Sequence, residues 1–381
     1  MSSNDWEQRK LSELGQIMTG STPSTSKSEY YSEDGIPWVT PTDIEATTIL
    51  DTPRKLSEEG AKVGRVVPAN TILCTCIASI GKNTLLMVKG SFNQQINSLT
   101  PYEENDAYFL LTESELWSNK MKRMAASGTM QIVNKTEFSE LQTMVPKSAE
   151  QKQIGSYFRN LDHLITLHQR KCEETKTLKK YMLQKMFPQN GHSVPEIRFS
   201  GFTEDWEQRK LDDVVEFLDT MRKPLEGAKR ISGPYPYYGA SGIVDYVDGY
   251  LFDEELILLS EDGANITDRN YPVCFIASGK YWVNNHAHVL RSKKGNENNF
   301  ICNSLERKDY TQYNTGMAMP KLNKETCRKI PVLCPTFEEQ QKIGDCFRSL
   351  DHLITLHHRK QNYVLNTLIY AKTTLFITKT S

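Results

Sequence analysis

The chain has 381 residues, of which 38% are hydrophobic and 9% aromatic, and this composition indicates globular domains rather than a disordered chain. The 46 Lys and Arg residues nearly balance the 47 Asp and Glu residues, so the net charge of −1 neither requires nor excludes a nucleic-acid partner. No apolar run approaches the ~20 residues of a membrane-spanning helix, and the eight cysteines include no CxxC motif. We therefore expect a cytoplasmic protein with reduced thiols, no membrane contact and no structural zinc.

The first domain is assigned to residues 1–147, where short apolar runs alternate with polar loops. A polar loop at residues 20–31 comes first, and a turn at residues 41–43 follows the first strand-like run. Strand-like runs are predicted at residues 36–39, 66–67, 71–77 and 85–88. A further polar loop at residues 127–131 precedes a long helix.

The segment FNQQINSL, residues 92–99, sets Asn93, Gln94, Gln95 and Asn97 among apolar neighbours. Side-chain amides can form bidentate hydrogen bonds with the edge of adenine. Amides can equally well cap turns or tie strands together. The sequence leaves both roles open.

A long amphipathic helix is predicted at residues 148–187, because apolar residues recur at helical spacing on one face and Pro188 ends the pattern. Its first part is the segment EQKQIGSYFRNLDHLITLHQRK, residues 150–171. The predicted apolar face consists of Ile154, Phe158, Leu161, Ile165, His168, Cys172, Leu178, Met182 and Met186. A face of this length requires a partner helix.

The second domain is assigned to residues 205–335, after a linker at residues 188–204 that is rich in Pro, Gly and polar residues. Turn and strand patterns alternate through its first part, with several glycines as turn formers. Two of its polar segments, at residues 284–288 and 314–316, correspond to FNQQINSL and to residues 127–128. The pair His286 and His288 lacks a nearby third metal ligand, and the alternating Cys74 and Cys76 are weak evidence for a metal site.

The second long helix, predicted at residues 336–381, repeats the first. Its segment EQQKIGDCFRSLDHLITLHHRK, residues 339–360, lies 189 positions after its counterpart (339 against 150), and DWEQRKL occurs identically at residues 5–11 and 205–211. Its apolar face consists of Ile343, Phe347, Leu350, Ile354, His357, Val364, Leu368, Ala371 and Leu375. We predict an α/β (α+β) fold with two globular domains, a pseudo-two-fold internal repeat and two long helices that pair antiparallel as a coiled coil.

Motifs of the enzymes that act on DNA are missing from this sequence. It contains neither NPPF nor DPPY, which a DNA methyltransferase would carry, and no GxxxxGK[ST] motif of an ATP-driven motor. We therefore expect no catalytic centre in the chain.

The chain resembles the specificity (S) subunit of type I restriction-modification systems over nearly its full length. The resemblance rests on the repeated helices, on GIPWVTPTDI (residues 35–44) with FNQQINSL, and on YYGASGIVDYVDGYLFDEELILLSEDGANI (residues 237–266) with VNNHAHVL (residues 283–290). It implies that each domain is a target-recognition domain that reads one half of a bipartite, asymmetric DNA site, while the helices set the spacing and dock modification subunits. PEIRFSGF precedes the second domain only, so the N-terminal end is expected to be shorter than the family pattern.

The resemblance also implies partners and cofactors. The partners are double-stranded DNA, two modification (methyltransferase) subunits and restriction (motor and nuclease) subunits. S-adenosylmethionine, ATP and Mg²⁺ would be bound by those subunits and none by this chain, which would be non-catalytic within a DNA adenine methyltransferase and endonuclease complex. The alternatives are a helical scaffold that binds proteins without DNA specificity, and an enzyme fragment that acts without partners.

The residues that we predict to contact DNA come from the polar loops, from the two corresponding clusters and from nearby basic positions. In the first domain they are Ser21, Thr22, Lys27, Tyr31, Thr42, Asn93, Gln94, Gln95, Lys122, Ser127 and Thr129. In the second domain they are Arg222, Tyr238, Ser241, Asn284, Asn285, His286, Lys293, Asn314 and Thr315. No residue is predicted to be catalytic or to bind a metal.

Overall fold

A computed structural model describes residues 6–127, 132–189, 191–227 and 230–377. The chain forms two compact units, one built from residues 1–169 with 359–381 and the other from residues 170–358. Two long helices, α5 (Ser148–Lys185) and α10 (Phe337–Ile377), each contribute one part to each unit. We call these the first unit and the second unit.

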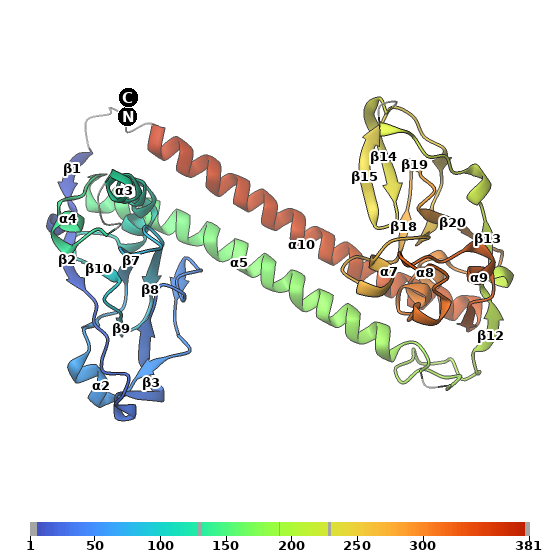
Figure 1. The fold of residues 1–381 in the computed structure, drawn as a ribbon, viewed down its shortest axis with the longest axis horizontal. Coiled ribbons are helices and arrows are strands. Elements are labelled where there is room, and N and C mark those ends of the chain that lie inside the picture. Colours follow the sequence, from blue (N-terminus) through green and yellow to red (C-terminus); the bar gives the residue numbers. More distant parts are fainter. Residues whose placement is uncertain (1–5, 128–131, 190, 228–229, 378–381) are drawn as a thin grey trace. The chain divides into compact units, whose positions relative to one another are not determined.

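The first unit carries short strands and one long helix of its own (Figure 1). Its elements before α5 are β1 (Glu7–Lys10), α1 (Leu11–Leu14), β2 (Gly15–Thr19), η1 (Ser28–Tyr30), β3 (Tyr31–Val39), β4 (Thr48–Ile49), β5 (Lys55–Leu56), α2 (Glu58–Val63), β6 (Val66–Val67), β7 (Thr71–Thr75), β8 (Asn83–Leu86), β9 (Gly90–Phe92), β10 (Ile96–Pro101), α3 (Ala107–Ser127), α4 (Lys135–Glu140) and β11 (Gln142–Val145). Helix α3 packs against β7 and β8. All five residues of β7 are buried, as its continuous apolar and β-branched sequence predicts.

Three sheets form the first unit. The largest has the strand order β2-β10-β7-β8-β4, a second has the order β5-β3-β9-β6, and β1 pairs with β11. Most pairs are antiparallel, but β3 runs parallel to β9. This parallel pair places the end of β3 beside the turn that joins β9 to β10.

Most elements of the second unit correspond in order to those of the first. Its elements are β12 (Glu207–Lys210), α6 (Leu211–Val214), β13 (Val215–Phe217), η2 (Asp219–Met221), β14 (Ser232–Gly239), β15 (Gly242–Val247), β16 (Phe252–Asp253), β17 (Leu256–Ser260), α7 (Asn265–Asp268), β18 (Cys274–Ala277), β19 (Lys280–Val283), β20 (Ala287–Ser292), α8 (Asn298–Glu306), η4 (Thr311–Tyr313), α9 (Lys324–Arg328) and β21 (Pro331–Cys334). Among the described elements, β4 and α2 of the first unit and α7 of the second have no counterpart. Its sheets have the orders β13-β20-β17-β18, β15-β14-β19-β16 and β12-β21. The parallel pair β14 and β19 takes the place of β3 and β9.

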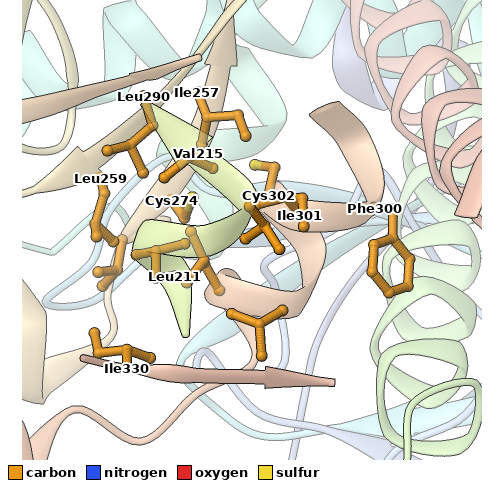
Figure 2. Close-up of a cluster of buried hydrophobic side chains, with 14 of the residues drawn as sticks. Leu211, Val215, Ile257, Leu259, Cys274, Leu290, Phe300, Ile301, Cys302 and Ile330 are labelled. Carbon is orange, nitrogen blue, oxygen red and sulfur yellow. The ribbon is translucent and has the colours of Figure 1, made fainter. Parts of the chain in front are cut away.

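The core of the second unit lies between its central sheet and α8 (Figure 2). Ile257 and Leu259 of β17 and Leu290 of β20 meet Phe300 and Ile301 of α8, and all five side chains are fully buried. Burying a large apolar side chain contributes about 1.5–3 kcal/mol. This core therefore fixes the strands whose ends carry the polar loops described below.

The two long helices bury their apolar faces against each other in both units. In the first unit, Phe158 of α5 shares a core with Leu368 of α10. In the second unit, Lys179 Nζ lies 2.6 Å from Asp351 Oδ1, and Met186 shares a core with Phe347. Residue numbers rise along α5 while those of its contacts fall along α10, so the helices are antiparallel, as predicted.

The prediction of the apolar face of α5 was wrong at Leu178. Leu178 is 47% exposed, although it continues the spacing of the buried residues before and after it. The neighbouring Lys179 is the residue that turns inward, where its ammonium pairs with Asp351. Within the described ranges, no helix has the length and apolar character needed to cross a membrane.

Candidate nucleic-acid interface

Asn93 builds the turn between β9 and β10. Its backbone N–H donates to the carbonyl of Val39 at the end of β3 (3.0 Å), and its Oδ1 accepts from the backbone N–H of Gln95 (3.0 Å). Asn93 is buried, whereas Gln94 at the tip of the turn is exposed. Asn93 therefore holds the turn, and the neighbouring Gln94 is presented to solvent.

The polar loop after β2 lies against this turn. The Thr22 hydroxyl donates to Gln94 Oε1. Ser21 is fixed from two sides, because its Oγ accepts from the backbone N–H of Arg65 (3.0 Å) and its carbonyl accepts from Trp38 Nε1 (3.2 Å). The structure thus brings the adjacent residues Ser21 and Thr22 next to Gln94, which lies 72 positions after Thr22 in the sequence.

Three more predicted residues lie at or next to the ends of β3. The Tyr31 hydroxyl donates to the carbonyl of Pro23 (2.8 Å), and burial raises the pKa of Tyr31. The Lys27 ammonium lies 5.1 Å from the centre of the Tyr30 ring. Thr42 is exposed in the turn that follows β3. Of these three residues, Tyr31 is tied to the loop of Ser21 and Thr22 by its bond to Pro23.

Lys122 lies beside a different loop of the first unit. It is exposed on α3, and its Cε lies 3.0 Å from the position that a Cβ at Gly81 would take. The loop that contains Gly81 follows β7 and joins the turn directly, since the Cys76 N–H donates to the carbonyl of Gln95 (2.8 Å). Ser127 is the last residue of α3, and Thr129 lies outside the described residues.

The second unit builds the same turn with different side chains. The Asn284 N–H donates to the carbonyl of Tyr238 (3.0 Å), and its Oδ1 accepts from the backbone N–H of His286 (2.8 Å). Asn284 is buried and Asn285 is exposed. Asn284 is thus the structural counterpart of Asn93, and Asn285 is the counterpart of the exposed Gln94.

His286 presents a partly exposed ring at this turn. Its Nδ1 lies 2.8 Å from Asp262 Oδ1, and 51% of its side chain is exposed. Asp262 also forms a β-bridge with Lys321, whose Nζ lies 3.3 Å from Glu261 Oε1. The turn is therefore bordered by an acidic pair and by the loop that ends at Lys321.

Asn314 and Thr315 begin that loop. Asn314 Oδ1 accepts from the backbone N–H groups of Gly316 and Lys321 (both 2.9 Å). The Thr315 N–H donates to the carbonyl of Lys321 (2.8 Å). Asn314 closes the loop, and Met317 is fully exposed at its tip.

Arg222 lies beneath the turn rather than on its surface. Its side chain is 13% exposed, Nη1 donates to the carbonyl of Ala287 (2.6 Å), and Nη2 lies 2.5 Å from Glu261 Oε2. Buried charges require such partners, because an unpaired one is costly. The structure gives Arg222 a supporting role, and its contact with DNA stays a prediction.

Tyr238 and Ser241 belong to the hairpin of β14 and β15. The Tyr238 ring packs 5.8 Å from that of Phe275, and burial raises its pKa. Ser241 is exposed at the tip, where the neighbouring Ala240 carbonyl accepts from the Ser260 hydroxyl. This bond ties the hairpin tip to the end of β17, next to the acidic pair.

Lys293 is not part of this cluster. It follows the far end of β20, where its N–H donates to the carbonyl of Val214 (2.8 Å) and its ammonium donates to the carbonyl of Asp212. The six residues of β20 separate it from the turn by about 20 Å. Its contact with DNA stays a prediction that needs a separate part of the duplex.

Lys321 and Val244 also lie beside the turn of the second unit, and the sequence did not predict this position for either residue. A Cβ at Gly239 would lie 2.9 Å from Val244 Cγ1 and 3.3 Å from Asn284 Nδ2, so Val244 adjoins the turn while 57% of it is exposed. Only the spacing of the hairpin glycines could have suggested this position. Lys321 stands in an irregular loop and has no signal in the sequence.

The described residues contain no group of three or more His, Cys, Asp and Glu side chains that could hold a metal ion. Cys74 and Cys76 are both buried, and Cys76 Sγ donates to the carbonyl of Cys74 (3.4 Å). His286 and His288 each bind a carboxylate through Nδ1. In both sequence patterns considered as metal sites, the side chains thus have hydrogen-bond partners within the protein.

Comparisons with known proteins agree with this arrangement. The family model described as the type I restriction modification DNA specificity domain matches residues 3–177 and 203–366. The type I restriction enzyme MjaIX specificity subunit of Methanocaldococcus jannaschii is 22% identical over 404 residues, which cover 96% of this chain and 90% of that protein. A putative type I restriction enzyme specificity subunit of Haemophilus influenzae is 34% identical over 154 residues, 40% of this chain and 39% of its own length.

A solved structure shows the same fold. The crystal structure of a type I restriction-modification system S subunit from M. genitalium matches with a TM-score of 0.70 and 16% sequence identity, over 100% of this chain and 96% of that one. The matched family segments together span most of the sequence. The chain therefore belongs to the family of type I restriction-modification specificity proteins and carries two DNA specificity domains.

Proposed function

We propose that this chain selects the DNA sequence for a type I restriction-modification complex, with each domain reading one half of a bipartite, asymmetric site on double-stranded DNA. One observation carries the proposal: the two domains build the same buried-asparagine turn, yet their side chains differ. One turn presents the exposed Gln94 beside the half-buried Gln95, whose Oε1 accepts from Asn93 Nδ2 (3.2 Å), and the other presents Asn285 and His286. A shared scaffold with different exposed donors and acceptors suits the reading of two different half-sites.

The two long helices support the second part of the proposal, which is that they dock two modification subunits and set the spacing of the half-sites. Leu164 on α5 and Leu353 on α10 are equivalent positions, and they are 38% and 41% exposed. Repeated apolar positions of equal exposure provide two equal surfaces for two copies of one partner.

We further propose that the chain has no catalytic role of its own. In the complete complex the methyltransferase subunits would bind S-adenosylmethionine, and the motor and nuclease subunits would bind ATP and Mg²⁺. The contribution of this chain would be to hold the duplex in register for these subunits. Purified without them, it should transfer no methyl group.

The base-reading role is tested by replacing Gln94 and Gln95 with Ala in the chain assembled with its modification subunits. Because each lost bidentate base contact costs about 1–3 kcal/mol, selection from random duplexes should recover a first half-site with relaxed sequence and an unchanged second half-site. Replacing Asn285 and His286 with Ala should relax the second half-site only. Sequencing of the bound DNA measures both.

Lys122→Ala is the matched comparison, because a phosphate contact carries no base information. It should weaken binding to all sequences. The slope of the logarithm of the binding constant against the logarithm of the salt concentration should become smaller in magnitude by about 0.9. If the Gln94 and Gln95 variant instead weakens binding uniformly and melts at a lower temperature, these residues hold the fold. Base reading would then belong to the loops at residues 21–31 and 237–241.

A further inference from the structure

A polar pair with one fully buried member occupies the same place in both domains. In the first unit, Thr19 of β2 lies opposite Asn97 of β10. In the second unit, the ladder of β13 and β20 ends with Phe217 opposite Leu290. The Leu218 N–H then donates to the Val289 carbonyl (2.8 Å), which places Asp219 opposite His288. Asn97 is 2% exposed and His288 is 1% exposed. Asp219 with His288 therefore replaces Thr19 with Asn97.

His288 is hydrogen-bonded through both ring nitrogens. Its Nδ1 lies 2.8 Å from Asp219 Oδ2, and its Nε2 lies 2.7 Å from the carbonyl of Leu322. A carbonyl can only accept, and so can an ionised carboxylate, so both ring nitrogens donate and the imidazole is positively charged. Burial opposes this charge, but Asp219 and Cys327 raise the pKa of His288 to about 10.

The first unit makes the same connection without charge. The Thr19 hydroxyl donates to Asn97 Oδ1 (2.6 Å), and Asn97 Nδ2 donates to the carbonyl of Val133 (3.4 Å). Val133 corresponds to Leu322. The Val133 N–H donates to the carbonyl of Cys76, just after β7, and the Leu322 N–H donates to the carbonyl of Glu261, just after β17. Each domain thus joins three separate segments through one buried side chain.

In the second unit these segments are the ones that carry the predicted DNA contacts. His288 is two residues after His286 at the turn, Leu322 directly follows the loop at residues 314–321, and Asp219 begins η2, three residues before Arg222. Asp219 Oδ1 also accepts from the backbone N–H of Val289 (3.1 Å). The pair therefore fixes the turn relative to the neighbouring loop.

We propose that Asp219 and His288 are positioning residues that set the half-site specificity of the second domain by holding the turn at residues 284–286 against the loop at residues 314–321. Thr19 and Asn97 have the same role in the first domain. This inference rests on the proposed function, because it requires that the turn reads DNA. Both pairs would act through the backbone that they hold, without contact to the duplex.

The test uses the full chain assembled with its modification subunits, on the duplex selected by the unaltered complex and on duplexes with one base pair changed in either half-site. His288→Asn leaves Asp219 buried without its charged partner, so discrimination at the second half-site should fall about tenfold or more, with the first half-site unchanged. Combining it with Asp219→Thr reproduces the neutral pair of the first domain. This double variant should recover discrimination to within about threefold.

Asp219→Asn is the second single variant, because it keeps the shape of the side chain and remains informative if His288→Asn does not fold. His192→Asn, at an exposed histidine of the linker, is the matched control and should change neither half-site. Equal weakening at both half-sites contradicts the inference. So does a double variant that regains its melting temperature without regaining discrimination. If the unaltered complex selects no bipartite sequence, the proposed function fails on its own.

Discussion

Four largely buried charges at and around His288 balance, since His288 and Arg222 are positive and Asp219 and Glu261 are negative, while the more exposed Lys321 adds a positive charge at the edge. Asp219 pairs with the imidazolium at 2.8 Å and lies 3.7 Å from Arg222 Nη2, while Glu261 pairs with Arg222 and Lys321. Burial acts to raise the pKa of Asp219, but the hydrogen bond from His288 and the charge of Arg222 hold it below its usual value. Because each charge has a partner, the set stabilises the second domain only while His288 stays protonated.

This arrangement predicts a specific pH dependence of stability. The pKa of His288 rises from 6.5 when unfolded to about 10 when folded. Because the folded-state pKa is the higher one, protonation of His288 contributes its full stabilisation of the folded state below pH 6.5. This contribution is lost as the pH rises towards 10. We expect the melting temperature of the unaltered chain to fall over this window relative to the Asp219→Thr, His288→Asn double variant, by the equivalent of a few kcal/mol.

The comparison between these two chains isolates the pair. Lys308 also titrates in this range, because burial lowers its pKa to about 8. Its effect on stability has the opposite sign, since the folded state favours its neutral form, but both chains contain Lys308 and the effect cancels. Melting curves at pH 6, 8 and 10 are sufficient. A difference between the two chains that does not change with pH would rule out a protonated His288.

At the level of single residues, the sequence located the turns but could not assign roles within them. Asn93 and Gln94 are adjacent amides, yet one is buried and one is exposed. The difference is set by the Val39 carbonyl, which reaches Asn93 from a strand more than fifty residues away. Arg222 is similar, since only the fold reveals the carbonyl of Ala287 and the carboxylate that hold it.

At the level of elements, each long helix docks onto its domain through one repeated joint. Gln151 Oε1 accepts from the backbone N–H of Asp106 (3.0 Å), just before α3. Gln340 Oε1 accepts in the same way from Glu297 (3.1 Å), just before α8. A glycine four residues further on leaves room for the carboxylate of Asp106 or Glu297, whose oxygen lies 2.0 Å from the position that a Cβ would take. The repeated EQ and IG pairs of the sequence form the helix side of this joint, and Asp106 or Glu297 forms the domain side.

Gly155→Ala should therefore destabilise the first domain. A Cβ at Gly155 would lie 2.0 Å from Asp106 Oδ1 and 2.9 Å from the backbone nitrogen of Phe109, which Asp106 caps. Overpacking of this kind costs about 1–3 kcal/mol, against a gain of about 1 kcal/mol in helix propensity. Ser156→Ala, at the exposed neighbouring position, is the control. Thermal melting of both variants should show a loss for Gly155→Ala only; equal melting would exclude the joint.

The sequence predicted the long helices well and the shorter elements less well. Both helices begin within one residue of the predicted positions, because their periodicity is long and a proline precedes each start. Helix α3 was missed, although Leu110, Trp117 and Met121 recur on one face. Strands β4 and β5 have two residues each and were also missed, since pairing alone defines strands so short.

At the level of the whole molecule, two domains with different central sequences share one topology. The order β2-β10-β7-β8 of the first matches β13-β20-β17-β18 of the second, and the parallel pair β3 and β9 corresponds to β14 and β19. The sequence revealed the shared ends and the correspondence of two polar segments, but not the shared topology, because a core accepts many combinations of apolar residues of suitable volume. The middles differ where side chains are exposed, and this difference supports the reading of two different half-sites.

The most direct test of this account is a chain in which residues 211–330 are replaced by residues 11–141. The exchange points are equivalent, since the Leu11 N–H donates to Leu141 (2.9 Å) and the Leu211 N–H donates to Ile330 (2.8 Å), and the joint on α10 offers the same Gln and Gly. Selection of bound DNA by the assembled hybrid should recover the first half-site twice, as an inverted repeat, with no trace of the second half-site. Recovery of the original asymmetric site would contradict the claim that each domain reads its own half.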